Sequence, residues 1–149
     1  MIHQVVVSER RQIVDERGKI MHMLRASDPE FQGFGEVYFS VINPGVIKAW
    51  HLHVRMTLNY TCPVGLIKLA LYDARVDSPT RGELMELFLG PDCYRLVQVP
   101  PGVWNGFKGV ATYPSLVCNC ATIAHDPEEI QRMDPMSSEI PYDWGLKHG

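Results

Sequence analysis

Apolar residues along this chain gather in short runs that turn-forming residues separate. The runs are rich in β-branched, aromatic and aliphatic side chains and cover residues 36–42, 46–53, 66–72, 84–89, 94–99 and 116–123. Between them lie turns that contain proline and glycine, such as N-P-G at 43–45 and P-P-G at 100–102. Short strands this close together, with turns between them, predict an antiparallel β-sandwich or barrel.

The signals for helix are weak, and the best of them lies near the C-terminus. Asp126 can cap a helix, Pro127 suits its first position, and the two glutamates that follow favour its first turn. We therefore expect one short helix there, ending near Asp134. The chain has no internal repeat, low-complexity tract or linker, so we expect one all-β domain over residues 1–149.

Composition narrows the class of protein. Of the 149 residues, 46% are hydrophobic and 21% are charged, as in a globular domain, and the net charge of −3 argues against nucleic-acid binding. No apolar stretch reaches the about 18 residues that a membrane helix needs, and residues 1–12 lack the apolar core of a signal peptide. Four cysteines without C-x-x-C spacing are too sparse for a disulfide framework. We therefore expect a reduced, cytoplasmic protein with no membrane or nucleic-acid partner.

A pair of histidines is the first candidate for chemistry. His51 and His53 are two residues apart on a predicted strand, so their side chains project from the same face. The spacing resembles the first metal-binding motif of cupins, but Leu58 stands at its glutamate, and Asn105 at the histidine of the second motif. Two imidazoles with a leucine and an amide make a poor site for Fe, Mn or Zn, so we predict no metal or other cofactor. Taken alone, the pair could be no more than polar lining of a barrel mouth.

Five blocks spread over most of the chain carry a family resemblance. They are D-x-R-G at 15–18, K-A-W-H at 48–51, D-x-R-x-x-S-P-T-x-G at 73–82, P-P-G-x-x-N-G-F at 100–107 and D-P at 134–135, with Trp144 beyond it. In kind and order they resemble those of the dTDP-4-dehydrorhamnose 3,5-epimerases, metal-free cupins that act on nucleotide-linked 4-keto-6-deoxy sugars. The resemblance implies a cupin jelly-roll barrel, an isomerase, and a homodimer paired through sheet edges.

The family's reaction implies two catalytic residues. It removes a proton at a carbon next to a ketone and returns one on the opposite face, which needs a base and an opposing acid. By resemblance His51 is the base, because imidazole titrates near neutral pH, and Asp134 is the carboxylate that holds it. Asp134 could instead be an ordinary turn or cap residue before a proline.

Other positions match the family's substrate contacts. Arg17 matches an arginine that contacts the nucleotide, and Lys48 stands where the family has an arginine on the phosphates. Arg75 could touch phosphate or form an internal ion pair with Asp73. A regular strand would point Lys48 away from His51, so both serve one pocket only if the strand has a bulge, or if Lys48 serves a neighbouring subunit.

The departures from the family concern the acid. The family's tyrosine, its opposite-face acid, falls at Asn119, which is expected to face the pocket but whose amide cannot donate a proton as an acid at neutral pH. The lysine near the ketone oxygen falls at Leu58, with Asn59 beside it. We expect Asn59, Asn105 and His53 to line the pocket or hold the diphosphate.

Without that tyrosine, the returning proton must come from water or from another donor such as Tyr38, Tyr60 or His53. One enolate is easier to form and collapse than two, so the sequence favours epimerisation at a single centre, C3, of a nucleoside-diphosphate 4-keto-6-deoxy sugar. Two alternatives stay open. One is a 3,4-ketoisomerase, in which His51 and His53 have separate tasks, and the other is a non-catalytic module that binds sugar nucleotides.

Overall fold

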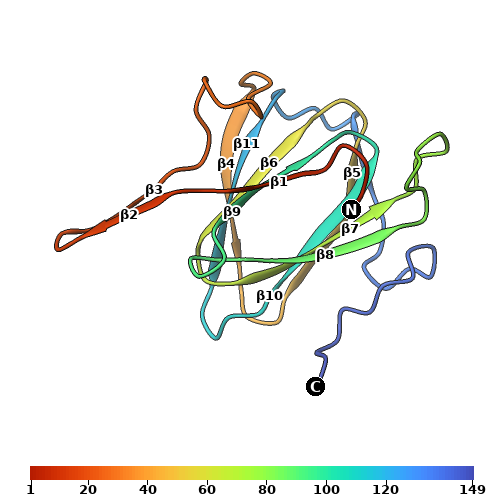
Figure 1. The fold of residues 1–149 in the computed structure, drawn as a ribbon. Helices are drawn as coiled ribbons and strands as arrows, with labels where there is room; N and C mark the ends of the chain where they lie inside the picture. Colours follow the sequence, from red (N-terminus) through yellow and green to blue (C-terminus); the bar gives the residue numbers. More distant parts are fainter.

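Two five-stranded antiparallel sheets face each other in the computed structural model, which describes residues 1–149 (Figure 1). The first sheet has the order β1 (Val6–Glu9), β9 (Arg95–Val99), β6 (Leu58–Val64), β11 (Ser115–Ala121) and β4 (Glu36–Ile42). The second has the order β12 (Ile130–Arg132), β5 (Ile47–His53), β10 (Val103–Gly109), β7 (Ile67–Asp73) and β8 (Leu84–Leu89). The predicted all-β jelly-roll barrel is confirmed.

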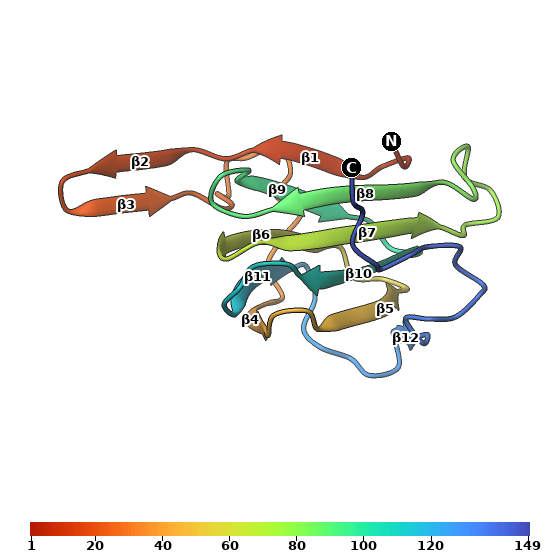
Figure 2. The same ribbon diagram turned by 90° about the horizontal axis from the view of Figure 1, so that it is seen from below.

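A third, two-stranded sheet stands apart from the barrel. It is a hairpin of β2 (Gln12–Asp15) and β3 (Gly18–Met21), and it projects from the barrel as an arm (Figure 2). Gly18 closes its turn with a φ of 133°, a backbone conformation that favours glycine. Residues 12–21 were not predicted as strands, because this segment is mostly polar and exposed.

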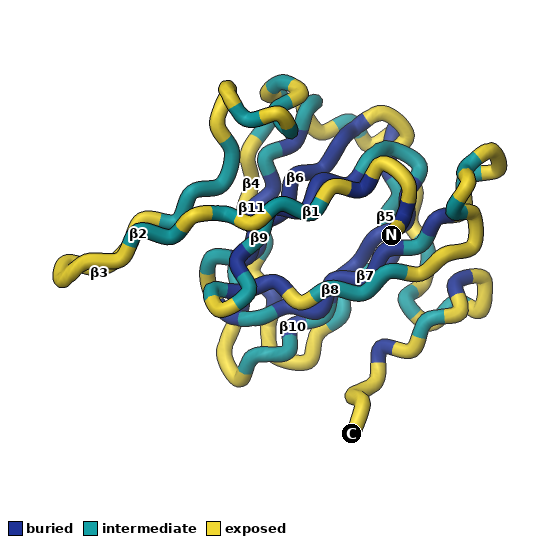
Figure 3. Tube along the Cα trace, viewed as in Figure 1, coloured by how far each residue is buried: buried dark blue, intermediate teal, exposed yellow.

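The main core lies between the sheets and fills one side of the barrel. Along β6, Leu58, Tyr60 and Cys62 alternate with polar residues and point inward, as the two-residue period of a strand requires. They meet inward side chains of β7 and β9, such as Leu69 and Val97. Buried residues accordingly concentrate on β6, β7 and β10 in Figure 3. Each large apolar side chain buried here contributes about 1.5–3 kcal/mol.

The C-terminal segment covers the outer face of the second sheet. Trp50 of β5 and Trp104 of β10 form a second core cluster with Ile140 and Trp144. The ring centroids of Trp50 and Trp144 are 5.0 Å apart. These tryptophans therefore belong to a core outside the barrel, which leaves the space between β4, β5 and β12 for a cavity.

The predicted C-terminal helix is absent, and this prediction was wrong. Asp126 does cap the backbone, because its Oδ1 accepts a hydrogen bond from the N–H of Glu128, at 3.0 Å. The result is one turn rather than a helix, because the side chain of Glu129 is bound by His53 and by the backbone of Arg55. The chain then continues as β12, which pairs with β5. Tertiary contacts outweigh the local helix signal here.

The D-x-R-x-x-S-P-T segment after β7 is organised around one buried carboxylate. Asp73 accepts hydrogen bonds from the backbone N–H, Nε and Nη2 of Arg75 and from the hydroxyls of Ser78 and Thr80, at 2.6–3.1 Å. Burial would raise the pKa of Asp73, but these donors hold it well below its usual range. Arg75 also donates to the backbone oxygen of His3, at 2.7 Å. Of the two roles weighed for Arg75, the structure shows the internal ion pair.

We expect loss of this carboxylate to destabilise the fold. Asp73→Asn removes the charge that compensates Arg75, so the free energy of unfolding should fall by about 2–3 kcal/mol. Asp77→Asn, an exposed residue of the same loop, should change it by less than about 0.5 kcal/mol. Urea denaturation measures both, and equal effects of the two substitutions would contradict the account.

Candidate active site

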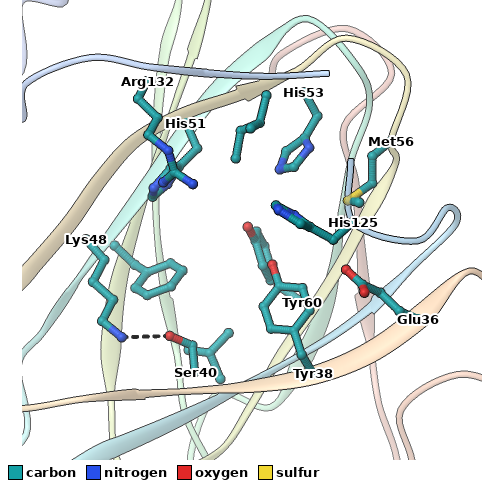
Figure 4. A pocket seen from close by; sticks show the side chains of 13 residues that line it. Glu36, Tyr38, Ser40, Lys48, His51, His53, Met56, Tyr60, His125 and Arg132 are labelled. Carbon is teal, nitrogen blue, oxygen red and sulfur yellow. Dashed lines mark hydrogen bonds between the residues drawn. The ribbon is translucent and has the colours of Figure 1, made fainter. Parts of the chain in front are cut away.

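A cavity of ≈ 450 Å³ opens between the two sheets (Figure 4). Its walls come from β4, β6 and β11 on one side and from β5, β10 and β12 on the other. Three histidines reach it, His51 and His53 from β5 and His125 from the segment between β11 and β12. Tyr38 and Tyr60 place their hydroxyls in it from the facing sheet. The cavity thus combines imidazoles, phenols and an apolar floor.

A bulge in β5 brings Lys48 and His51 to the same cavity. His51 pairs with Asn105 of β10 and Lys48 pairs with Phe107, so three steps along β5 match two along β10. The extra residue turns Lys48 to the same face of β5 as His51, whereas in a regular strand the two side chains would point to opposite faces. Lys48 Nζ then donates to the hydroxyl of Ser40, at 2.9 Å, and to the backbone oxygen of Val41, at 2.8 Å.

The side chain of His51 has no hydrogen-bond partner within the protein, and its environment disfavours protonation. Burial lowers its pKa to about 4, and the positive charge of Arg132 is the next largest cause. Arg132 lies directly opposite His51 in the pairing of β12 with β5, and it forms no ion pair. At neutral pH the imidazole of His51 is therefore uncharged and able to accept a proton.

The histidine–carboxylate pair of this cavity is His53 with Glu129. His53 Nδ1 and Glu129 Oε1 are hydrogen-bonded, and both side chains are buried. Glu129 Oε2 also accepts from the backbone N–H groups of Arg55 and Met56, at 3.1 and 3.2 Å. Burial would raise the pKa of Glu129, but these hydrogen bonds together lower it. No sequence pattern indicated this role, because Glu129 lies in the segment predicted as helix.

Asp134 does not join His51 through a hydrogen bond. Its side chain is exposed, and Oδ1 accepts from the backbone N–H of Met136, at 2.7 Å. This is the turn role weighed for Asp134 from the sequence. A carboxylate partner would favour the charged imidazole, so its absence, burial and nearby positive charge all favour the neutral state of His51.

The three predicted asparagines form the wall behind the cavity. Asn105 accepts from the hydroxyl of Tyr60, at 3.0 Å, and donates to the backbone oxygen of His51, at 3.1 Å. Asn119 donates to the hydroxyl of Tyr38, also at 3.0 Å. Asn59 is fully buried.

The backbone N–H and both side-chain polar atoms of Asn59 are hydrogen-bonded within this wall. Its backbone N–H donates to Asn119 Oδ1, at 2.9 Å, its Nδ2 donates to the backbone oxygen of Cys120, at 2.8 Å, and its Oδ1 accepts from Gln98, at 2.9 Å. These amides set the positions of the cavity side chains and do not themselves line the cavity.

Two predicted contacts lie away from the cavity of the same chain. Arg17 stands at the tip of the projecting arm, where it pairs with Asp15, at 2.6 Å, and is exposed. Arg75 is held by Asp73 after β7. Of the predicted site residues, the structure brings His51, His53 and Lys48 to the cavity, and it adds Arg132, which the sequence pattern did not single out.

No group of three or more histidine, cysteine, aspartate or glutamate side chains is arranged to hold a metal ion. The structure also has no helix of the length and apolar character that crossing a membrane would require.

A sequence model of the dTDP-4-dehydrorhamnose 3,5-epimerases matches residues 1–148. The chain belongs to this family. Its members are nucleotide-sugar epimerases, so the protein is an isomerase of that class.

Individual relatives agree with the family assignment. The chain is similar to the probable low-salt glycan biosynthesis epimerase Agl13 of Haloferax volcanii, with 36% identity over 95% of this chain and 89% of the relative. It is 31% identical to the spore coat polysaccharide biosynthesis protein SpsL of Bacillus subtilis, over 96% of this chain and 91% of that protein. The crystal structure of a dTDP sugar isomerase from Desulfovibrio desulfuricans superimposes with a TM-score of 0.94 at 44% identity, over 96% of this chain and 92% of the other.

The charge of Arg132 gives a direct test of why His51 is neutral. Arg132→Gln should raise the pKa of His51 from about 4, because it removes a positive charge that opposes protonation. Arg81→Gln, at an exposed position in the loop after β7, should leave that pKa unchanged. NMR titration of the imidazole resonances measures both. A His51 pKa near the unperturbed value of about 6.5 in the unaltered protein would contradict the account.

Proposed function

We propose that this family member epimerises a nucleoside-diphosphate 4-keto-6-deoxy sugar at C3, with His51 as the base. The observation that carries the proposal is the uncharged imidazole of His51, which faces a cavity and has no hydrogen-bond partner within the protein. A proton on a carbon next to a ketone is acidic enough for a well-placed imidazole to remove. His51 then needs no metal ion and no carboxylate partner to begin the reaction.

The charges around His51 suit an anionic substrate. Lys48 and Arg132 line the same cavity, and neither is paired with a carboxylate. Two such cations favour a bound diphosphate and the negative charge that develops on an enolate oxygen. That enolate charge also favours the imidazolium form of His51, so the substrate itself would offset the low pKa of the free protein as the proton moves.

A single epimerised centre fits the arrangement of the proton-transfer groups. Of the two imidazoles that β5 brings to the cavity, His51 has no side-chain partner, whereas His53 is bound by Glu129. In this proposal His51 therefore removes a proton from one carbon, C3, and a single enolate forms and is reprotonated.

The pair of His53 and Glu129 supports a second candidate, a 3,4-ketoisomerase. It places a second proton-transfer group beside His51 in the same cavity. In that reaction His51 would remove the C3 proton and His53 would move a proton between the oxygens of an enediol.

Solvent exchange distinguishes these functions. The unaltered protein, incubated in D2O with a dTDP-linked 4-keto-6-deoxy sugar and followed by proton NMR, should exchange the C3 proton and form the C3 epimer. His51→Asn should slow this exchange by about 10²-fold or more, because it removes the base while sparing the cations that bind the substrate. His3→Asn, an exposed histidine outside the cavity, should exchange at the unaltered rate.

Each other outcome of this experiment contradicts the proposal. Migration of the ketone would establish the isomerase, and exchange at both C3 and C5 would show two epimerised centres. Binding without exchange, across dTDP-, GDP- and CDP-linked sugars, would indicate a non-catalytic module. Full exchange by His51→Asn would remove His51 from the mechanism.

We further propose that the protein is a homodimer paired through β4. This strand is an edge of the first sheet, and its outward side chains Val37, Phe39 and Val41 are 47%, 63% and 56% exposed. An apolar edge strand is a ready surface for pairing with a second copy.

Light scattering during gel filtration tests the pairing. The unaltered protein should elute with twice the chain mass of 16.9 kDa. Phe39→Glu should shift it to the monomer, because it would bury a charge in the interface. Val76→Glu, at a position 71% exposed in the loop after β7, should leave the dimer intact. A monomer before any substitution would contradict the proposal.

A further inference from the structure

We infer that Tyr38 is the acid that returns a proton to the sugar on the face opposite His51. This assignment rests on the proposed epimerase function and supplies the proton donor that it lacks. The family's tyrosine position is occupied by Asn119, and Asn119 donates a hydrogen bond to the hydroxyl of Tyr38, at 3.0 Å. A phenol thus lies one strand away from that position, on β4, where Tyr38 is directly opposite Asn119 of β11.

The hydrogen bonds of Asn119 leave the proton of Tyr38 free. Asn119 Oδ1 accepts from the backbone N–H of Asn59, at 2.9 Å, and a backbone N–H can only donate. The oxygen of the amide must therefore face Asn59, and its NH₂ group must face Tyr38. The hydroxyl of Tyr38 is an acceptor in this bond, so its own proton can point into the cavity.

Tyr60 is the other phenol of the cavity, and its hydroxyl proton is already used in a hydrogen bond within the protein. Asn105 Nδ2 donates to the backbone oxygens of His51 and Val103, at 3.1 and 3.4 Å, which places Asn105 Oδ1 toward Tyr60. The hydroxyl of Tyr60 donates to that oxygen, at 3.0 Å. Donation to a substrate would cost Tyr60 this buried hydrogen bond.

His53 is a weaker candidate for geometric reasons. It lies on β5, two residues from His51, so both imidazoles enter the cavity from the same sheet. Tyr38 enters from β4 of the facing sheet (Figure 4). Inversion at a carbon requires the base and the acid on opposite sides of the sugar ring, and of these two only Tyr38 faces His51 from across the cavity.

The chemistry of Tyr38 suits a general acid. Burial raises its pKa, the hydrogen bond from Asn119 opposes this, and Glu36 raises it further. The phenol is therefore protonated at neutral pH, and Asn119 Nδ2 is in place to stabilise the phenolate left after donation. Tyr38 is 39% exposed, so the phenolate can recover a proton from water.

The complete step balances without any further reactant. His51 takes the C3 proton, and the electron pair of that C–H bond moves into the enolate. The enolate carbon then forms a new C–H bond on its other face with the phenolic proton of Tyr38. Water returns a proton to the phenolate and takes one from the imidazolium, so the protein is restored.

The partition of products in D2O tests this assignment. In Tyr38→Phe, His51 still removes the C3 proton and can return a deuteron to the same face. The C3 epimer should therefore form about 10²-fold more slowly, while deuterium still enters C3 of the unepimerised sugar. Persisting exchange also shows that this variant is folded and binds substrate. In His51→Asn both products should be lost.

Two matched variants remove a hydroxyl elsewhere. Tyr60→Phe should keep the unaltered ratio of epimer to exchanged, unepimerised sugar, whatever its rate. Tyr113→Phe, at a position 55% exposed outside the cavity, should keep both ratio and rate. Epimerisation by Tyr38→Phe at the unaltered rate, or loss of the epimer in Tyr60→Phe alone, would overturn the assignment. Absence of any exchange with the unaltered protein would instead refute the proposed function, and this assignment with it.

Discussion

The bulge between Lys48 and His51 is the constraint on which the cavity depends. It places Lys48 on the face of β5 that already carries His51 and His53, so one strand delivers a cation and two imidazoles to the same space. Gly106 of β10 permits it, because a Cβ atom there would lie 2.3 Å from the Cβ of Ala49. The outward residue Trp50 is meanwhile fixed in the second core by Trp144. The bulge is thus held from both faces of the sheet.

Burial and charge, rather than a carboxylate partner, decide the protonation state of the proposed base. Arg132 and Lys48 oppose protonation of His51, whereas the carboxylate of Glu129 is hydrogen-bonded to His53 instead. Buried amides add a second level of control, because each amide oxygen or NH₂ group fixes which phenol donates and which accepts.

The sequence predicted the barrel well and the site in part. Residues 36–42 and 84–89 were predicted as strands with the ends that β4 and β8 have, because alternation and turn residues are local signals. The barrel strands β1, β6, β10 and β12 were missed. In β6, Asn59, Thr61 and a proline break the apolar pattern, and those polar side chains are buried only through contacts with distant strands.

Errors in the site have the same physical origin. The cap signal at Asp126 was correct locally, but no local pattern shows that Glu129 meets His53, which lies 76 residues earlier in the chain. For Arg75 and Asp134 the sequence left two roles open. The structure shows an ion pair with Asp73 for Arg75 and a turn for Asp134. Motif matches identify positions, while hydrogen-bond competition decides what each side chain does.

The pH dependence of kcat/KM tests the central claim that His51 acts as a neutral base in the free protein. We expect kcat/KM for C3 epimerisation to be constant between about pH 5.5 and 8 and to fall only at lower pH, because the base must be unprotonated. The midpoint of that fall should lie at about 4, the pKa of His51. An acid limb centred near about 6.5, the value for an unperturbed imidazole, would contradict it.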